Sequence, residues 1–527
     1  MLTDSKSDEM PVRLKTWLIF FLYSGFIAFL IQFIILPYIL PAVHAGNGLL
    51  AGNDSTRFHQ TATDLADQIH SGGWSAWTLR PNGWGTAGIA GAIYALTVPQ
   101  PWTLIPVNAA LHATAALFLA NTMFLFLNNW RRSAIAALPF LLYPSAMNWY
   151  TQLLKDNYFV PGTVISIYGW LLLIRLESWQ NNWMKVGKAI ALIFSGITLV
   201  WLVRPYGVQM LQGIMAVNCI LVTGLFIYRG WRSVLQWPKV MMGIITIWVI
   251  IGLISPFTKA GIHMTATDDF GTGLNNGGSA AYIDKQKDKT DEAPEETLGG
   301  IPADNTGKSS HEPTTEMPNG STNQARQDTT EPGQSVSQDG KQAEKPNPAQ
   351  SETMEKPSRI FAAINNRLFT LAEVRAGFLR GYTDNDSNID FDVNFEDAGD
   401  IIRYLPRALE ISLFAPFPNQ WFNSRSGVSK ILNSVAALEN VFIYLTMAFV
   451  PFALWQWRRQ AELWVLVLFS VGMMWVYGLV IPNIGALYRV RYSFIMTVAA
   501  IGISGGFMVL QKYCDKKQTY EGEVFKC

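Results

Sequence analysis

Residues 17–40 decide the fold class, because they read WLIFFLYSGFIAFLIQFIILPYIL and carry no charged side chain. A helix that crosses a bilayer needs about 20 mostly apolar residues, so this stretch is long enough to span one. It is longer than the apolar core of a secretory signal peptide, and no small-residue cleavage site follows it. We therefore expect a membrane-spanning helix that stays in the protein.

Apolar stretches of this kind recur along the 527-residue chain. Half of the residues are hydrophobic (50%) and only 15% are charged, whereas a soluble domain has about a quarter of its residues charged. The composition therefore excludes an ordinary soluble enzyme and predicts an all-α polytopic membrane protein with about ten transmembrane helices. The predicted spans are 16–41, 103–127, 134–153, 157–175, 188–203, 208–228, 240–257, 436–456, 461–481 and 490–511. A shorter apolar stretch at 85–98 is typical of a re-entrant or interfacial helix.

The distribution of Lys and Arg predicts the orientation in the bilayer. Basic residues concentrate in cytoplasmic segments, and alternate segments here carry pairs such as Arg131-Arg132 and Arg458-Arg459. The short segments of the other set hold fewer basic residues. We therefore expect both termini to lie in the cytoplasm, with a long first loop and a large insert on the outer side.

The chain divides into five segments by composition. They are an N-terminal transmembrane module (1–258, with its first outer loop at 42–102), a linker (259–357), a small ordered outer or interfacial segment (358–435), C-terminal transmembrane helices (436–511) and a cytoplasmic tail (512–527). Residues 270–357 are rich in small, polar and charged residues and nearly lack aromatic ones, so they bury too little apolar surface to fold. The outer insert is therefore predicted to be partly disordered.

Local patterns in the ordered outer segment predict three short elements. Residues 359–380 have apolar side chains at helical spacing between arginines, which is typical of an interfacial helix. Residues 388–395 alternate polar and apolar, which predicts a short strand. The acids at 384–392 lack the glycine that a calcium loop needs, so a solvated strand face is the preferred interpretation. Residues 401–422 predict an amphipathic helix ended by two prolines.

The first outer loop carries an early acid, Asp54, just before a predicted helix from about Ser55 to His70. The apolar face of that helix would consist of Phe58, Ala62, Leu65, Ala66 and Ile69. Asp54 either caps the helix or acts as a general base at the boundary between water and lipid. Asp64 is a second candidate for the base. Arg57, His59 and Asp64 are candidate substrate-binding residues.

A second acid, Asp156, follows Lys155 in a short outer turn after the third predicted span. A Lys-Asp pair at a helix end is often an interfacial anchor. The alternative is that Asp156 is catalytic and that Lys155 contacts the substrate.

Two arginines enter the last predicted span from the outer side, at Arg489 and Arg491. Their position opposes the positive-inside trend and costs insertion energy unless an anion faces them. Guanidinium groups bind phosphate oxygens in a bidentate way, so the pattern predicts a lipid-linked phosphate, with bulk lipid headgroups as the alternative. The candidate binding residues of this kind are Arg204, Tyr206, Tyr488, Arg489 and Arg491.

The sequence indicates no cofactor with certainty. Six histidines show no metal-ligand spacing, and three scattered cysteines form no disulfide framework. A divalent metal ion held by Asp54 and Asp156 is the one cofactor hypothesis. The net charge of +1 gives no field that attracts nucleic acid, so we expect no nucleic-acid partner.

These features resemble the GT-C class of integral-membrane glycosyltransferases, and within it the bacterial lipid-carrier-dependent group of protein mannosyltransferases and aminoarabinose transferases. The class has an early aspartate of the form Asp-x-x-x-Tyr/Phe-x-x-x-Ala in the first outer loop, and a Pro-Ser turn with an outer acid after the third span. The matching residues are Asp54, Phe58 and Ala62 for the first motif, and Pro144, Ser145 and Asp156 for the second. Many members have paired acids in this loop, where this chain has Asn53 before the aspartate.

The resemblance implies a transferase of the bacterial inner membrane with a periplasmic active face and a role in cell-envelope polysaccharide biosynthesis. It would move a hexosyl or pentosyl group from a polyprenyl-phosphate or polyprenyl-diphosphate donor to a glycan, lipid or protein acceptor. Asp54 would be the base, and Asp156 would orient the acceptor or hold a metal. Arg489, Arg491 and Arg204 would neutralise the departing phosphate.

Two other functions fit the same composition. An O-antigen-type polymerase or ligase would depend on the outer arginines Arg375, Arg380 and Arg403. A transporter or flippase of lipid-linked sugars would need internal repeats and charges buried within the spans, whereas the spans are almost free of ionisable groups, with Glu439 as the clear exception.

Overall fold

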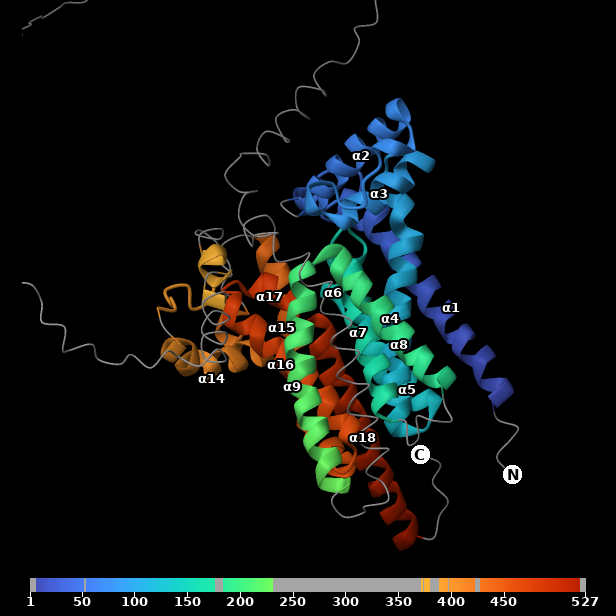
Figure 1. The fold of residues 1–527 in the computed structure, drawn as a ribbon, viewed down its shortest axis with the longest axis vertical. Coiled ribbons are helices and arrows are strands. Elements are labelled where there is room, and N and C mark those ends of the chain that lie inside the picture. The colour runs from blue at the N-terminus through green and yellow to red at the C-terminus, as the bar shows by residue number, and fades with distance from the viewer. Residues whose placement is uncertain are drawn as a thin grey trace, which may run out of the picture. The chain divides into compact units, whose positions relative to one another are not determined.

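The computed structural model describes residues 6–51, 54–175, 183–230, 371–372, 374–379, 388–396, 398–421 and 427–521, all within one compact unit. Every regular element in these ranges is a helix, and the β pairs there are two isolated bridges, His44 with Leu50 and Asn388 with Asn483. Figure 1 shows the helices. The predicted linker 259–357 and the predicted span 240–257 lie outside the described residues.

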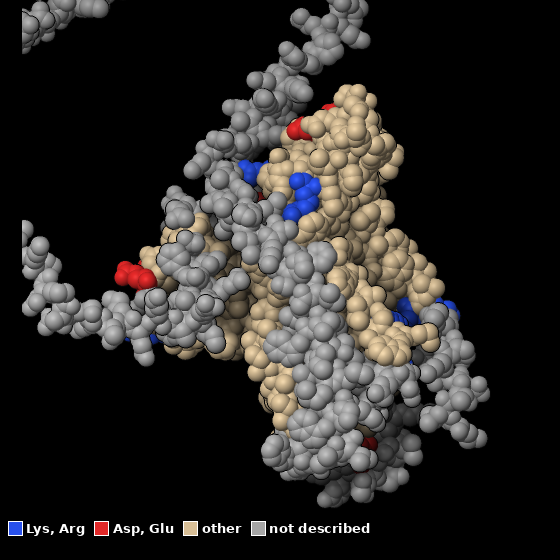
Figure 2. Space-filling model, in the orientation of Figure 1, with Lys and Arg blue, Asp and Glu red and all other residues tan. Residues whose placement is uncertain are grey.

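Seven described helices are long and apolar enough to cross a membrane, which confirms a helical, membrane-embedded protein at that level. They cover Val12–Ile39, Pro101–Leu127, Asp156–Ile174, Trp183–Val203, Ser434–Trp457, Ala461–Val480 and Tyr492–Asp515. Figure 2 shows that the described surface is mostly uncharged over one face, with a few Lys, Arg, Asp and Glu side chains.

The seven candidates belong to named helices, some of which run beyond them. The helices are α1 (Lys6–Leu30) with its π-helical extension (Ile31–Ile39), α4 (Ile105–Leu127) with the 3-10 turn before it (Pro101–Leu104), α7 (Asp156–Ile174), α8 (Trp183–Val203), α15 (Gly427–Trp457), α16 (Ala461–Val480) and α18 (Tyr492–Glu521). The predicted span 208–228 lies within α9 (Pro205–Gly230).

The predicted span 134–153 is wrong as one continuous helix, because it breaks into α5 (Trp130–Leu142) and α6 (Pro144–Tyr150). Tyr143 between them is extended, with φ −68° and ψ 114°. A residue before proline is pushed out of the helical region by the proline ring, so Pro144 ends one helix and begins the next. The break brings the chain into α7 by a short turn.

Helix α7 is the most enclosed candidate span, with 89% of its apolar window buried. It packs along α8 through facing glycines, because a Cβ on Gly162 would lie 2.7 Å from the carbonyl oxygen of Gly196. Small residues let two helix backbones approach closely in a membrane, where packing replaces the hydrophobic driving force. The N-terminus of α7 is thereby held in the interior of the unit.

The first loop (42–102) folds into α2 (Asp54–Gly72) and α3 (Gly85–Leu96), which lie side by side in Figure 1. The predicted apolar face of α2 is confirmed, since Phe58, Ala62, Leu65, Ala66 and Ile69 are all buried. Phe58, Ala62 and Ala66 form a small core with Ala90 and Tyr94 of α3. This core fixes the first residue of α2 against the rest of the loop.

The segment 358–435 contains α14 (Ala398–Phe414), followed by Pro416 and Pro418, as the pattern over 401–422 predicted. The predicted strand at 388–395 is wrong. This stretch is an irregular loop with a single bridge at Asn388, and Asp390 adopts a positive φ of 47°. Of the predicted helix 359–380, residues 371–372 and 374–379 are described and helical.

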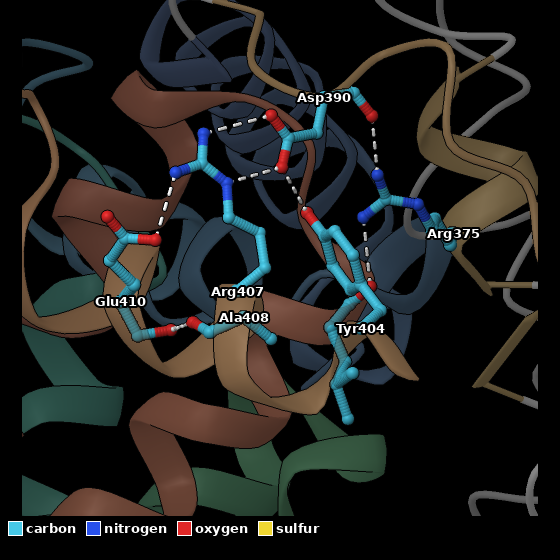
Figure 3. Close-up of polar contacts among 8 residues, drawn as sticks. Arg375, Asp390, Tyr404, Arg407, Ala408 and Glu410 are labelled. Atoms are coloured by element: carbon cyan, nitrogen blue, oxygen red, sulfur yellow. Dashed lines mark hydrogen bonds and ion pairs between the residues drawn. The ribbon is translucent and has the colours of Figure 1, made fainter. Parts of the chain in front are cut away.

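A cluster that we call the Asp390 clasp explains this loop (Figure 3). Arg407 of α14 donates two hydrogen bonds to the Asp390 carboxylate, from Nε to Oδ2 at 2.9 Å and from Nη2 to Oδ1 at 3.2 Å. The Tyr404 hydroxyl donates a third to Oδ2 at 3.0 Å. Arg375 donates to the carbonyl oxygens of Asp390, Val393 and Leu479 at 2.6–3.0 Å. These hydrogen bonds join the loop at 388–395 to α14 and to the end of α16.

The clasp also sets the charge state of its carboxylate. Burial raises the pKa of Asp390, but hydrogen bonds from Arg407 and Tyr404 outweigh burial and bring the pKa below its usual range. The same contact raises the pKa of Arg407. A calcium ion does not fit at this carboxylate, because a guanidinium group already covers both of its oxygens.

Candidate functional site

Four charged residues from distant parts of the chain meet at one place. Asp54 is the first residue of α2 and Asp156 the first of α7, Arg204 joins α8 to α9, and Arg489 lies in α17 (Ile484–Val490). Asp156 Oδ1 lies 2.9 Å from Arg204 Nη2, and its Oδ2 lies 3.1 Å from Arg489 Nε. Arg489 Nη2 also lies 3.7 Å from Asp54 Oδ2. We call these four residues the charged network.

The charged network runs from the interior to the surface. The side chains of Asp156 and Arg204 are 4% and 6% exposed, that of Arg489 is 20% exposed, and that of Asp54 is 52% exposed. Two buried ions must offset a desolvation cost with close contact, and the shortest distance indeed joins the most buried pair. The outermost contact is the longest, so the Asp54 carboxylate is the member most accessible to a molecule arriving from solvent.

The buried side-chain amides of Gln152 and Asn108 hold the turn that precedes α7 and its first residue, Asp156. Gln152 accepts a hydrogen bond from the Leu50 amide at 3.0 Å and donates one to the Gly48 carbonyl at 3.1 Å. Asn108 of α4 donates to the Gln152 carbonyl at 3.2 Å. The first loop is therefore tied to the turn that precedes α7. Gly48 has a φ of +73°, and a Cβ there would lie 2.8 Å from Gln32 Cβ, so only glycine fits.

The two arginines of the network sit at helix boundaries. Arg204 precedes Pro205, which begins α9, and its guanidinium lies 4.8 Å above the Phe159 ring. Arg489 belongs to α17, which begins after Asn483, whose side chain accepts from the Ala486 amide at 3.0 Å. Capping of this kind fixes where a short helix starts, and hence where its arginine points.

The second predicted arginine of that stretch, Arg491, lies elsewhere. It is buried and donates to the carbonyl oxygens of Ile411 at 3.3 Å, Ser412 at 2.6 Å and Ala415. These carbonyls close the C-terminal end of α14, where a cation is favoured. The structure therefore brings Arg489 and not Arg491 to the charged network.

Other predicted substrate-binding residues surround α2. Lys155 Nζ lies 5.6 Å from the Phe58 ring centre, and Arg57 lies 5.9 Å from that of Trp84. Arg57 is exposed, and so is Asp64, which accepts a hydrogen bond from Gln60 at 2.7 Å, while Tyr206 is half-buried in the first turn of α9. His59 is buried, and its Nδ1 lies 3.0 Å from the Tyr94 hydroxyl. Burial lowers the pKa of His59 to about 4, so the ring is neutral at pH 7.

Glu439 of α15 is a connecting residue that the sequence marks only as an acid within a span. Its carboxylate accepts from the Ser145 amide at 2.6 Å, from the Ser145 hydroxyl and from the Tyr488 hydroxyl at 2.7 Å. Tyr488 also meets Tyr143 at 3.1 Å. Glu439 thus joins α15, α6 and the helix that carries Arg489. The role of Tyr488 in this structure is to hold that helix.

The arginines proposed for a polymerase or ligase occupy different settings. Arg375 is fully engaged with backbone carbonyls in the clasp, and Arg403 is exposed beside Asp400 at 3.2 Å. Arg380 lies outside the described residues.

A divalent metal does not fit the charged network. Within the described ranges, no group of three or more His, Cys, Asp or Glu side chains is placed to hold a metal ion. Asp54 and Asp156 share a guanidinium instead, and both oxygens of Asp156 face cations. We therefore derive no step through a metal.

The network combines an accessible carboxylate with a guanidinium that a phosphate could bind. Phosphate competes well for such a group because it offers two oxygens and more than one negative charge. An anion arriving at Arg489 would displace its longest contact, the one to Asp54. No family model, no curated protein and no solved structure matches the chain.

Proposed function

We propose that the protein is a membrane glycosyltransferase that uses a polyprenyl-phosphate or polyprenyl-diphosphate sugar donor. The acceptor is a glycan, lipid or protein on the periplasmic face of the bacterial inner membrane. The observation that carries the proposal is the charged network, in which an exposed carboxylate and a mostly buried guanidinium lie 3.7 Å apart.

The contacts support the proposed orientation. The segments around Asp54, Asp156, Arg204 and Arg489 all belong to the set with fewer basic residues, which the positive-inside rule places outside. Their side chains meet within 2.9–3.7 Å. Four turns assigned to one side by charge alone must share one end of the helices for these contacts to form.

Arg489 is the proposed phosphate-binding residue. Its Nε is held by buried Asp156 at 3.1 Å, while its Nη2 meets the exposed Asp54 at the longer distance. A donor phosphate can take the Nη2 side without breaking the buried contact. The guanidinium then faces the negative charge that develops on the leaving phosphate, which lowers the barrier electrostatically.

Asp54 is the proposed general base. The acceptor hydroxyl oxygen attacks the anomeric carbon, the bond from that carbon to the phosphate oxygen breaks, and the hydroxyl proton passes to Asp54. The lipid-linked phosphate leaves with the bonding electron pair. A positioned base of this kind contributes about 100-fold to 10,000-fold to a rate.

Asp156 is the proposed positioning residue. It pairs with Arg204 and Arg489 at the buried end of the network, so it sets the direction of the guanidinium that binds phosphate. Its burial leaves the more exposed Asp54 to meet the acceptor.

The test compares lipid-linked and surface glycans by mass spectrometry in a deletion strain complemented with the intact gene or with Asp54→Asn. We expect deletion to remove a defined sugar and Asp54→Asn to fail to restore it at normal membrane abundance. Stability should change by less than about 1 kcal/mol, because the carboxylate is half-exposed and its ion pair is long. The matched control is Asp67→Asn, which removes an exposed acid from the same helix.

Each outcome points to a residue. If Asp54→Asn fully restores the sugar, Asp54 is not the base. If Asp64→Asn then fails to restore the sugar, Asp64 is the base. Failure of Asp67→Asn to restore the sugar shows that the charge of α2, rather than Asp54, is what matters.

A further inference from the structure

A narrow pocket lies beside Asp156. It is bounded by α4, α6, α7 and the start of α18, and among its lining residues are Asn108, His112, Trp149, Tyr150, Asn157 and Tyr492. Asp156 itself contributes to the lining. The pocket therefore adjoins the buried end of the charged network.

Besides Asp156, whose carboxylate is paired with two arginines, three of the lining side chains carry a polar atom without a hydrogen-bond partner. These atoms are His112 Nε2, the Tyr150 hydroxyl and Asn157 Oδ1, and each residue is at most 6% exposed. Buried polar groups are nearly always hydrogen-bonded, and leaving one without a partner destabilises the fold. Three such atoms around one pocket indicate a group that supplies partners there when it binds.

The walls of the pocket are aromatic. The His112 ring stacks on Tyr150 with centres 4.0 Å apart and on Phe140 at 5.0 Å, and Trp149 meets Tyr492 edge-on at 5.6 Å. A phenol and an imidazole can each donate or accept a hydrogen bond, and an amide oxygen accepts. Hydroxyl groups, which also donate and accept, match this set. An anion does not, because the Asp156 carboxylate lines the same pocket and would repel it.

We propose that this pocket receives a hydroxyl or hydroxymethyl group of a sugar, with His112, Tyr150 and Asn157 as its hydrogen-bonding partners. The inference rests on the proposed glycosyl transfer and names the part of the substrate that the site would recognise. Ring stacking and a few directed polar groups are the usual makeup of a small-molecule site. The narrowness of the pocket favours one hydroxyl-bearing substituent over a whole sugar ring.

Two substitutions remove the polar atoms and keep an aromatic ring at each position. Tyr150→Phe deletes the hydroxyl alone, whereas His112→Phe puts a phenyl ring into the same stack and also removes the hydrogen bond of His112 with the Phe140 backbone. If these polar atoms only cost stability, their removal raises thermal stability and leaves the glycan product unchanged. If they bind a sugar hydroxyl, we expect the product to fall at least about tenfold in both variants while the stability of Tyr150→Phe stays the same or rises, which is the pattern of a functional group kept at a structural cost.

The matched control is Ser470→Ala, in α16. Ser470 Oγ is also buried without a partner, but Ser470 does not line the pocket. We expect it to leave the product unchanged. A tenfold loss with Ser470→Ala would assign the effect to helix packing in general and overturn the pocket.

A second measurement uses the full-length protein in detergent and needs no transfer reaction. A panel of free monosaccharides and a long-chain polyprenyl phosphate are added at millimolar concentration, and Tm is recorded, since a ligand of the folded state raises it. We expect one monosaccharide to raise Tm for the intact protein and for Ser470→Ala but not for Tyr150→Phe or His112→Phe. The polyprenyl phosphate should raise Tm in all four.

The outcomes separate the two proposals. If Asp54→Asn loses the product while Tyr150→Phe and His112→Phe keep both product and monosaccharide binding, the pocket proposal is wrong and the transferase proposal stands. If Asp54→Asn keeps the product, the transferase proposal fails, and the monosaccharide measurement still decides the pocket.

Discussion

The Asp390 clasp and the charged network are both built from aspartate and arginine, yet they differ in how they are closed. In the clasp, Arg407 holds one carboxylate with two nitrogens and Arg375 is saturated by three carbonyls. In the network, Arg489 is divided between two carboxylates at 3.1 and 3.7 Å. The clasp, whose hydrogen bonds are all short, holds a loop in place. The charged network has one longer contact at its exposed end, and a ligand can replace that contact.

The largest expected effect is that of Asp156→Asn. It leaves Arg204, which is 6% exposed, without its counter-charge, and breaking one side of a buried ion pair costs about 3–5 kcal/mol. We expect a clear loss of Tm and of membrane abundance, together with loss of the glycan product. Unfolding in detergent measures Tm, and mass spectrometry measures the glycan product. A stable Asp156→Asn protein would show that the buried end of the network is not held by charge.

Arg489→Lys tests the contacts of the charged network without disturbing the packing of α17. Lysine keeps the charge but lacks the fork that meets two carboxylates at once, and loss of one well-placed stabilising group costs about 100-fold in rate. We expect that loss of product with little change in Tm. The matched control is Arg491→Lys, two residues away, which should lower Tm because Arg491 closes the end of α14. The reverse pattern would exchange the roles of the two arginines.

Asp390→Asn tests the clasp. It removes charge-assisted hydrogen bonds from Arg407 and Tyr404, each worth about 1.5–3 kcal/mol, so stability at pH 7 should fall by an amount of that order. Because the pKa of Asp390 is below its usual value in the folded protein, this contribution is present above pH about 4 and is lost as pH falls through the folded pKa.

The measurement for the clasp is Tm against pH for the intact protein and Asp390→Asn. The difference in Tm between the two proteins should be largest at pH 5–7 and should become smaller below pH about 4. Asp392→Asn is the control, since that neighbouring acid is exposed. A difference that stays constant at low pH would mean that the clasp does not depend on an ionised carboxylate.

The comparison also shows what sequence patterns can resolve. Helical periodicity predicted the buried face of α2, and the charge bias predicted which turns lie together, so Asp54, Asp156, Arg204 and Arg489 could be assigned to one region. Periodicity could not separate Arg489 from Arg491. That separation depends on α17 being helical, because residues two apart on a helix point in nearly opposite directions.

Other features depended on tertiary contacts that no local pattern records. The alternating residues 388–395 favoured a strand, but pairing of Asp390 with Arg407 imposes a turn with positive φ. Gln152 was not singled out, because an amide reveals its role only once its partners Leu50 and Gly48 are brought beside it. A glutamine four residues before a candidate acid is the sequence signal that could have found it.

The smallest expected effect is that of Arg403→Ala, and it decides between two functions. Arg403 is 81% exposed and pairs with Asp400 one helical turn away, so its removal should change stability by less than about 0.5 kcal/mol. In a transferase built on the charged network it should leave the glycan product unchanged. In a polymerase or ligase that depends on outer arginines, the length of surface glycan chains should shorten instead. Asp400→Asn, which frees the same arginine without removing it, distinguishes loss of the pair from loss of the cation. Shortened chains with Arg403→Ala and normal chains with Asp400→Asn would therefore move the chemistry from the Asp54 end of the molecule to α14.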